Sequence, residues 1–231
     1  MKYKHLFFDL DHTLWDFERS SAESLTEVYH TFKIAELGVG SLDNFISTYL
    51  RINYQLWREL ERNEIPHTHI REHRFRLVME DLGIQADTDY RPMEETYIDL
   101  LPTKSYLMDG ALDVLDYVQE KGYILHILTN GFDVVQGKKM QSSGIYDYFT
   151  HVITNEKAQA RKPERRIFEY AISCAGAPCH ECLMIGDNWE ADIMGARNFG
   201  MDTVYYNPEG TPFEEAPTHD IRHLRELMEI L

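Results

Sequence analysis

Short apolar runs recur along the chain and, after the first run, alternate with segments of helical periodicity. Short apolar runs bounded by polar or glycine positions are typical of buried strands. Their alternation with amphipathic helices predicts an α/β fold, a parallel sheet with helices on both faces. The predicted strands are Lys4–Phe8, Tyr123–Leu128, Phe149–Ile153, Leu183–Ile185 and Thr203–Tyr206.

The helices between these strands have recognisable ends. Asp109 is expected to cap one helix, which Gly122 would end, and Pro163 is expected to open another that stops before Gly176. A closing helix near the carboxyl terminus shows the same period. The apolar positions of the three helices are Leu112, Leu115 and Val118, then Ile167, Phe168, Ala171 and Ile172, then Ile221, Leu224, Leu227 and Met228.

A long stretch between the first two strands, from about Ser20 to Leu101, is helical in pattern and has no strand signal. It predicts an all-helical cap over residues 18–103, inserted into a core formed by 1–17 and 104–231. Ser20 and Glu23 have the spacing of a capping box at the start of its first helix. Further helices are expected from about His69 to Leu82 and from about Arg91 to Leu101, and a second helix carries Phe45, Tyr49, Ile52, Leu56 and Leu60 on one face.

Composition limits the classes of partner. The 231 residues are 43% hydrophobic, enough for a globular core, and the formal net charge of -16 disfavours duplex nucleic acid. A small phosphorylated metabolite remains a plausible partner if a local cation holds it. No apolar run has membrane-spanning length, and three cysteines cannot all pair, so we expect a cytoplasmic protein without a membrane partner.

The first strand runs directly into a loop with two carboxylates and a hydroxyl. Residues two apart in an extended chain share a face, so Asp9 and Asp11 can converge on one hard cation, with the Thr13 hydroxyl nearby. Such a group suits metal-assisted attack on phosphorus, although a lone D-x-D triplet is often only an acidic turn.

Polar residues also follow two other predicted strands. Thr129, Asn130 and Gly131 lie before a helix that begins near Phe132, where unpaired N–H groups can bind phosphate oxygens. Gly186 and Asp187 end a later strand, and Asp192 follows them. Lys162, next to Pro163, would add positive potential beside a helix amino terminus. Ligands at the ends of parallel strands lie along a single edge, which favours one shared site.

In order and spacing, these segments resemble the four motifs of haloacid dehalogenase (HAD)-like phosphatases over nearly the whole chain. The resemblance implies a Rossmann-like core, a C1-type helical cap and a Mg²⁺ cofactor. It implies that Asp9 is the nucleophile and Asp11 the acid/base, and that Asp187 binds the metal. The further roles it implies are phosphate binding by Thr129, Asn130 and Lys162, metal contacts from Asp9 and the backbone carbonyl of Asp11, and support from Thr13, Gly131 and Asp192.

The implied reaction passes through an aspartyl phosphate on Asp9. To act as an acid near neutral pH, Asp11 needs a pKa above about 3.9, so we expect its surroundings to raise that pKa. Asp11 also argues against dehalogenase chemistry, which in this superfamily lacks the second aspartate. His12 and Arg161 depart from the usual motif residues without removing a catalytic group.

Two other patterns are assigned less weight. His69-Ile-Arg-Glu-His73 fits an H-x-x-E-H zinc motif, but we interpret it as a polar helix face because no third ligand is identifiable. Cys179-His-Glu-Cys182 is interpreted as a loop before a strand, not a redox pair or half of a zinc site.

The substrate prediction depends on the cap and on the residues after the nucleophile loop. The Leu14–Phe17 segment and the cap type resemble the pyrimidine 5'-nucleotidase branch, which favours nucleoside 5'-monophosphates. Alternatives are a sugar phosphate or phosphoglycolate phosphatase, a phosphomutase, and a non-catalytic phosphate-binding module. Four aromatic rings could flank a nucleobase or pack between cap and core: Trp15, Phe17, Tyr54 and Trp57.

Overall fold

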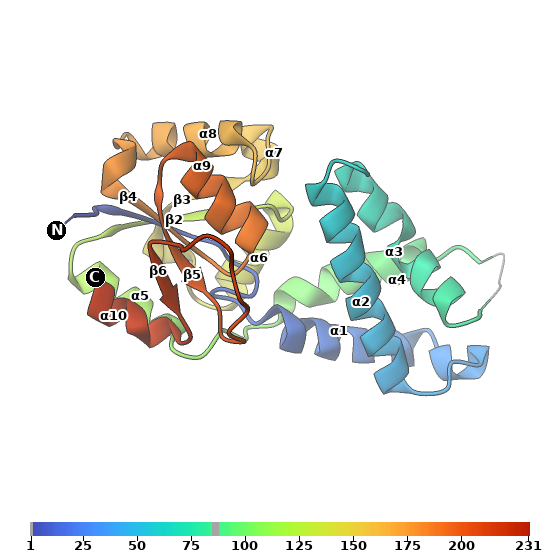
Figure 1. Cartoon of the computed structure of the whole chain (residues 1–231). Coiled ribbons are helices and arrows are strands. Elements are labelled where there is room, and N and C mark those ends of the chain that lie inside the picture. Colours follow the sequence, from blue (N-terminus) through green and yellow to red (C-terminus); the bar gives the residue numbers. More distant parts are fainter. Residues whose placement is uncertain (1, 85–87) are drawn as a thin grey trace. The chain divides into compact units, whose positions relative to one another are not determined.

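The computed structural model describes residues 2–84 and 88–231. The chain forms two compact units (Figure 1). One consists of Met1–Phe17 together with Ser105–Leu231, and the other is Glu18–Lys104. We call them the sheet unit and the helical unit, and each is described by itself.

The sheet unit is built on one parallel sheet, as the alternating pattern predicts. Within the described residues it has six strands in the order β3-β2-β1-β4-β5-β6, and each neighbouring pair is parallel. The five predicted strands are confirmed to within a residue or so at their ends, and the last, short edge strand was not predicted. The strands are β1 (His5–Phe8), β2 (Ile124–Thr129), β3 (Phe149–Thr154), β4 (Cys182–Gly186), β5 (Asp202–Tyr206) and β6 (His219–Ile221).

Helices cover both faces of this sheet. In Figure 1, α8 (Arg165–Ala175) and α9 (Gly195–Phe199) lie on one face, and α5 (Ala111–Glu120) and α10 (Leu227–Ile230) lie on the other. Strand β1 is buried along its whole length, as expected for a central strand of a sheet with two covered faces. The remaining helices of the unit are α6 (Asp133–Ser142) and α7 (Asn155–Ala158).

Three predicted helix starts differ from the structure. The first helix, α1 (Phe17–Thr31), begins three residues before Ser20, so Ser20 is a buried helical residue and not the amino-terminal cap. The amino-terminal cap position of α5 is Gly110 at φ 81°, and Asp109 is paired with Arg225 at 2.8 Å. Helix α8 begins at Arg165, two residues beyond Pro163, after Glu164 as its cap.

The predicted closing helix is wrong in its first part. Ile221 ends β6, where it is paired with Tyr206 of β5, and its carbonyl accepts a hydrogen bond from the Asn207 N–H at 2.8 Å. A 3₁₀ turn over Leu224–Glu226 then leads into the short α10. Pairing with the sheet edge therefore overrides the helical period of the apolar residues. Leu112, another predicted core position, is 46% exposed on α5.

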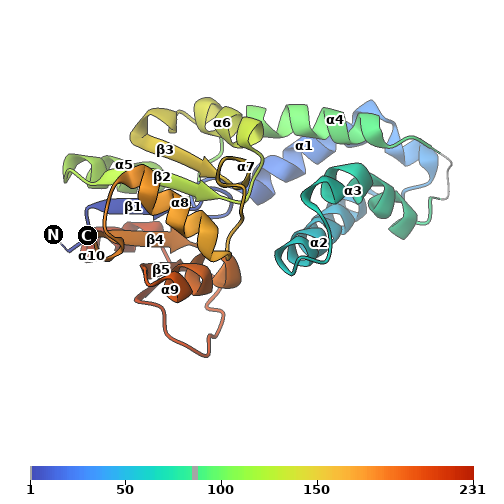
Figure 2. The same ribbon diagram turned by 90° about the horizontal axis from the view of Figure 1, so that it is seen from above.

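The helical unit consists of α1, α2 (Leu42–Glu61), α3 (His67–Asp81) and α4 (Arg91–Leu100) (Figure 2). The predicted apolar face of α2 is confirmed, since all five of its residues are buried. Helices α1 and α4 are joined by a 2.9 Å hydrogen bond between Ser21 Oγ and Tyr97 Oη. Among the described residues, no helix has the length and apolar character needed to cross a bilayer.

Candidate active site

Three adjacent strands bring polar residues to the same edge of the sheet. Asp9 follows β1, Thr129 is the last residue of β2, and Asp187 follows β4. Since β1 lies between β2 and β4 and all three are parallel, their carboxyl ends meet at one edge. Asp9 and Thr129 are buried there, 8% and 2% exposed.

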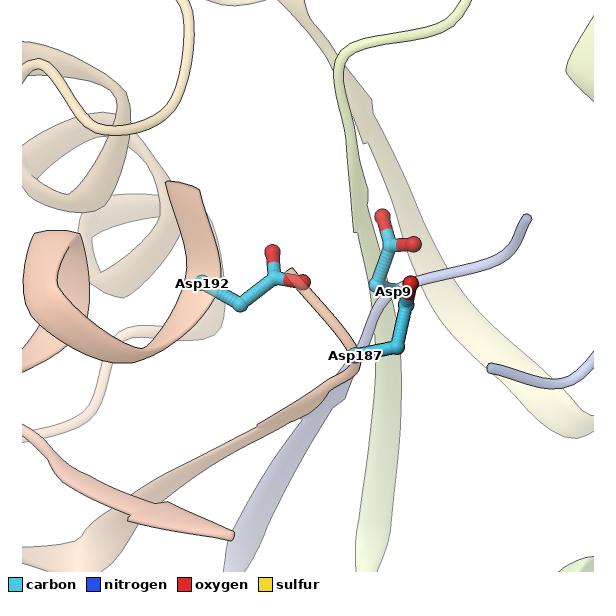
Figure 3. A group of neighbouring side chains, drawn as sticks. All are labelled: Asp9, Asp187 and Asp192. Carbon is cyan, nitrogen blue, oxygen red and sulfur yellow. The ribbon is translucent and has the colours of Figure 1, made fainter. Parts of the chain in front are cut away.

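Three carboxylates form a cluster at this edge (Figure 3). One oxygen each from Asp9, Asp187 and Asp192 lies within 4.8 Å of the others. Asp192 comes from a π-helical turn, Trp189–Met194, and its Oδ2 accepts from the Asn188 N–H at 3.1 Å. Thr13 Oγ1 donates to Asp187 Oδ1 at 3.0 Å, so the loop after β1 also orients this carboxylate.

Lys162 is the ammonium partner of the cluster. Its Nζ donates to Asp9 Oδ1 and Asp192 Oδ1, each at 2.6 Å, and to the Leu128 carbonyl at 2.8 Å. The Asn130 side chain braces the Lys162 backbone in both directions, donating to its carbonyl at 2.9 Å and accepting from its N–H at 2.8 Å. One N–H and the oxygen of the Asn130 amide are thus used to hold the Lys162 backbone in place, and the second N–H of this amide is available as a donor to phosphate.

The cluster carries more negative than positive charge. Burial raises the pKa of Asp9 to about 7, although Lys162 opposes this shift, and burial raises the pKa values of Asp187 and Asp192 to about 6. The same carboxylates hold the pKa of Lys162 above its ordinary value despite its burial. Three carboxylates beside one ammonium favour a further cation, and their all-oxygen donor set suits Mg²⁺.

The turn after β2 requires glycine at position 131. Its N–H donates to Thr129 Oγ1 at 3.1 Å, and a Cβ built on Gly131 would lie 1.9 Å from Gln136 Nε2. Gln136 Nε2 itself donates to Thr129 Oγ1 at 2.9 Å. The Thr129 hydroxyl is thus oriented from two sides and retains its own proton for donation to a ligand.

The expectation that the site raises the pKa of Asp11 is wrong for this arrangement. Burial alone would raise it, but the Lys139 ammonium, 2.6 Å from Asp11 Oδ1, and the Gln136 amide together hold this pKa below its ordinary value. Sequence reasoning missed both partners. The two residues lie three apart on the helix after Thr-Asn-Gly, and only the folded structure shows that they turn inward.

The structure also gives the surroundings of four other residues singled out in the sequence. Trp15 is fully buried, with Lys139 Nζ 4.4 Å from its ring centroid, so its ring has no free face to offer a nucleobase. His12 adopts a left-handed backbone at φ 63° and its N–H donates to the Trp15 carbonyl at 2.9 Å. Arg161 lies 3.7 Å from Glu164. Tyr54, in the helical unit, is 65% exposed.

The sequence also matches a protein-family model. Residues 3–200 match the haloacid dehalogenase-like hydrolases. The chain belongs to this family. Two related proteins are pyrimidine 5'-nucleotidases. PynA of Streptococcus pneumoniae is 32% identical, and the match covers 100% of this chain and 96% of PynA. YjjG of Escherichia coli is 29% identical, and the match covers 100% of this chain and 99% of YjjG.

Other relatives widen the range of phosphorylated substrates within the family. A glyceraldehyde 3-phosphate phosphatase of Pyrococcus abyssi is 33% identical over 88% of this chain and 81% of its own. The HAD-hydrolase YfnB of Bacillus subtilis was solved bound to magnesium. Its structure superposes on this one with a TM-score of 0.88 and 29% sequence identity, covering 100% of this chain and 99% of YfnB. Together with the family match, these relatives identify the chain as a HAD-like phosphatase.

Proposed function

We propose that this chain is a Mg²⁺-dependent phosphomonoester hydrolase that acts on nucleoside 5'-monophosphates. The single observation that supports the catalytic part is the cluster of Asp9, Asp187 and Asp192, in which the buried Asp9 and Asp192 both pair with Lys162. A nucleophilic carboxylate beside a buried ammonium and two further carboxylates is the set of charges that phosphoryl transfer requires.

In this proposal Asp9 attacks phosphorus through one carboxylate oxygen, and the substrate alkoxide leaves as the aspartyl phosphate forms. Lys162 and the Thr129 hydroxyl hold the transferring group. The covalent aspartyl phosphate divides a slow hydrolysis into two faster steps. Asp11 would protonate the leaving oxygen and then deprotonate the water that cleaves the aspartyl phosphate. For the first of these steps its carboxylate must take up a proton although Lys139 and Gln136 lower its pKa. Mg²⁺ would be held by Asp9, Asp187 and the backbone carbonyl of Asp11, with Asp192 in support. It would neutralise charge on the phosphoryl oxygens.

The two pyrimidine 5'-nucleotidase relatives, each aligned over the full chain, support the nucleotide part of the proposal. The helical unit would then act as the cap that selects the substrate. The Pyrococcus abyssi relative supports a second candidate, the phosphatase of a small sugar phosphate. Both candidates use the same Asp9 chemistry and differ only in what the helical unit accepts.

A phosphate-release assay with Mg²⁺ distinguishes these candidates. The panel is UMP, dUMP and dTMP against glyceraldehyde 3-phosphate, phosphoglycolate and a hexose phosphate, with Asp9→Asn as the inactive control. We expect the highest kcat/KM on a pyrimidine nucleotide and loss of phosphate release in the Asp9 variant. Much faster turnover of the sugar phosphates would contradict the nucleotide assignment, and transfer of the phosphate to another hydroxyl of a sugar would indicate a mutase.

A further inference from the structure

Helix α6 directs two buried polar side chains at the carboxylate of Asp11. Gln136 and Lys139 lie three residues apart on one face of the helix and are 0% and 3% exposed. Lys139 Nζ donates to Asp11 Oδ1 at 2.6 Å, and Gln136 Nε2 donates to Asp11 Oδ2 at 2.8 Å. Both oxygens of Asp11 are therefore held by donors from a single helix.

Aromatic rings fix the other side of the Lys139 ammonium. Its Nζ lies 4.4 Å from the ring centroid of Trp15 and 5.6 Å from that of Phe17. A desolvated ammonium over an aromatic face is stabilised by the ring quadrupole. The backbone of Trp15 also forms an isolated β-bridge with that of Asp11 within the loop after β1. Lys139 is thus confined between the carboxylate and the rings, and the ion pair has one geometry.

The same helix couples Asp11 to the phosphate-binding turn. Gln136 Nε2 donates to Thr129 Oγ1 at 2.9 Å as well as to Asp11. Gly131 leaves the space that this amide occupies. One side chain therefore sets the spacing between the carboxylate proposed to move protons and the hydroxyl proposed to hold phosphate.

We infer that Lys139 and Gln136 are positioning residues of the phosphatase reaction, which hold the Asp11 carboxylate in register with Thr129 and so with the leaving oxygen of the substrate. This inference rests on the function proposed above. Neither side chain need touch the substrate, because both act through Asp11. Loss of the Lys139 ammonium removes the donor to one oxygen and leaves Gln136 holding the other, so the orientation of the carboxylate is less restrained.

The test compares leaving groups that need a proton with one that does not. Lys139→Met keeps the apolar stem against Trp15 and removes the ammonium, and Lys138→Met is the matched control because Lys138 is its exposed neighbour on α6. The substrates are UMP, which leaves as an alkoxide, and p-nitrophenyl phosphate, which leaves as a stable phenolate. We expect Lys139→Met to lower kcat/KM for UMP about tenfold or more beyond its effect on p-nitrophenyl phosphate.

Three further variants test whether the loss of activity in Lys139→Met comes from the position of Asp11. Lys139→Arg is expected to restore part of the UMP activity, and Gln136→Leu to show the same dependence on leaving group. Lys138→Met is expected to match the wild type on both substrates. Equal losses on the two substrates from the Lys139 and Gln136 variants would overturn the inference. If the Lys139→Met protein does not fold, Lys139→Arg and Gln136→Leu decide by the same ratio.

The Asp9→Asn variant separates this inference from the proposed function. Full activity in Asp9→Asn would refute the proposed function itself. An inactive Asp9→Asn together with a Lys139→Met variant that behaves like Lys138→Met would refute only the positioning role.

Discussion

Gly186 shows how closely the site residues are packed. It ends β4 next to Asp187, and a Cβ at this position would lie 2.2 Å from Asp192 Oδ2. Real side-chain contacts do not approach this closely, so any larger residue must push Asp192 away from Lys162. The glycine before Asp187 is therefore required by space.

We expect Gly186→Ala to lower kcat at least about a hundredfold and to destabilise the fold by about 1–3 kcal/mol, because the displaced carboxylate loses its ammonium partner. Steady-state kinetics and urea denaturation measure the two effects. Gly137→Ala is the matched control, since nothing lies within 4 Å of its Cβ on α6. That variant should keep full activity and gain about 0.5–1 kcal/mol; equal behaviour of the two variants would show that the contact at Gly186 is unimportant.

The carboxylate cluster also predicts how Mg²⁺ and pH act together on stability. The pKa values of Asp9, Asp187 and Asp192 rise from an ordinary 3.8 to about 6–7 on folding without a metal. The folded state then binds more protons than the unfolded state between about pH 4 and 7, so the free energy of unfolding of the metal-free protein falls as pH rises through that window.

Mg²⁺ should relieve this loss, because a bound cation stabilises the ionised carboxylates. We expect the rise in Tm on adding Mg²⁺ to reach about 5–10 °C near neutral pH at a hundredfold excess over its Kd, and to shrink towards pH 5. Calorimetry of chelator-treated protein measures this difference. A rise in Tm that is the same at both pH values would count against a metal site at these carboxylates.

Among the helices, those of the helical unit are joined by a buried ion pair. Arg74 of α3 donates to Glu94 of α4 at 2.5 and 3.2 Å and to Asn53 of α2 at 2.7 Å. The guanidinium carbon lies 5.1 Å from the ring centroids of both Tyr49 and Tyr97. Three helices thus share one buried charged centre.

We expect Arg74→Met alone or Glu94→Leu alone to destabilise the protein by about 3–5 kcal/mol, because each leaves its partner charged and buried. The double variant should lose less free energy of unfolding than the sum of the losses in the two single variants, since it leaves no unpaired charge. Chemical denaturation of the four proteins completes the cycle. Additive losses would mean that the pair contributes through packing alone.

For the chain as a whole, the two segments that flank the helical unit in sequence pair with each other inside the sheet unit. The Asp16 N–H donates to the Tyr106 carbonyl at 3.0 Å, and the Met108 N–H donates to the Leu14 carbonyl at 2.9 Å. The segments that lead into and out of the helical unit therefore run side by side, and the insertion leaves the sheet continuous.

We expect a protein in which a short glycine linker replaces residues 18–104 to fold and to hydrolyse p-nitrophenyl phosphate within about tenfold of the full chain, because the residues proposed to be catalytic all lie in the sheet unit. Its preference among phosphate esters should disappear, since the binding energy of the rest of the substrate is lost. The same substrate panel measures both. Retention of the full preference would place substrate selection in the sheet unit.

Much of the fold was predictable from sequence because burial selects apolar residues. Five strands follow from continuous apolar runs, since strands of a sheet with two covered faces are buried on both sides, and the apolar face of α2 follows from the helical period. Strand β6 was not predictable, because it has only three residues and Ile221 fits a helical pattern equally well. Only its pairing with β5 decides between the two.

The sequence by itself determined which groups stand at the strand ends, among them Asp9, Thr129 and Asp187, because parallel strands must finish at a common edge. Only the tertiary structure decided the surroundings of those groups. Asp11 meets Lys139 across 128 residues of chain, and that ammonium, not burial, sets the direction of its pKa shift. Periodicity specifies which face of a helix turns inward, whereas the electrostatics of a site depends on distances between residues far apart in sequence, which the folded chain alone defines.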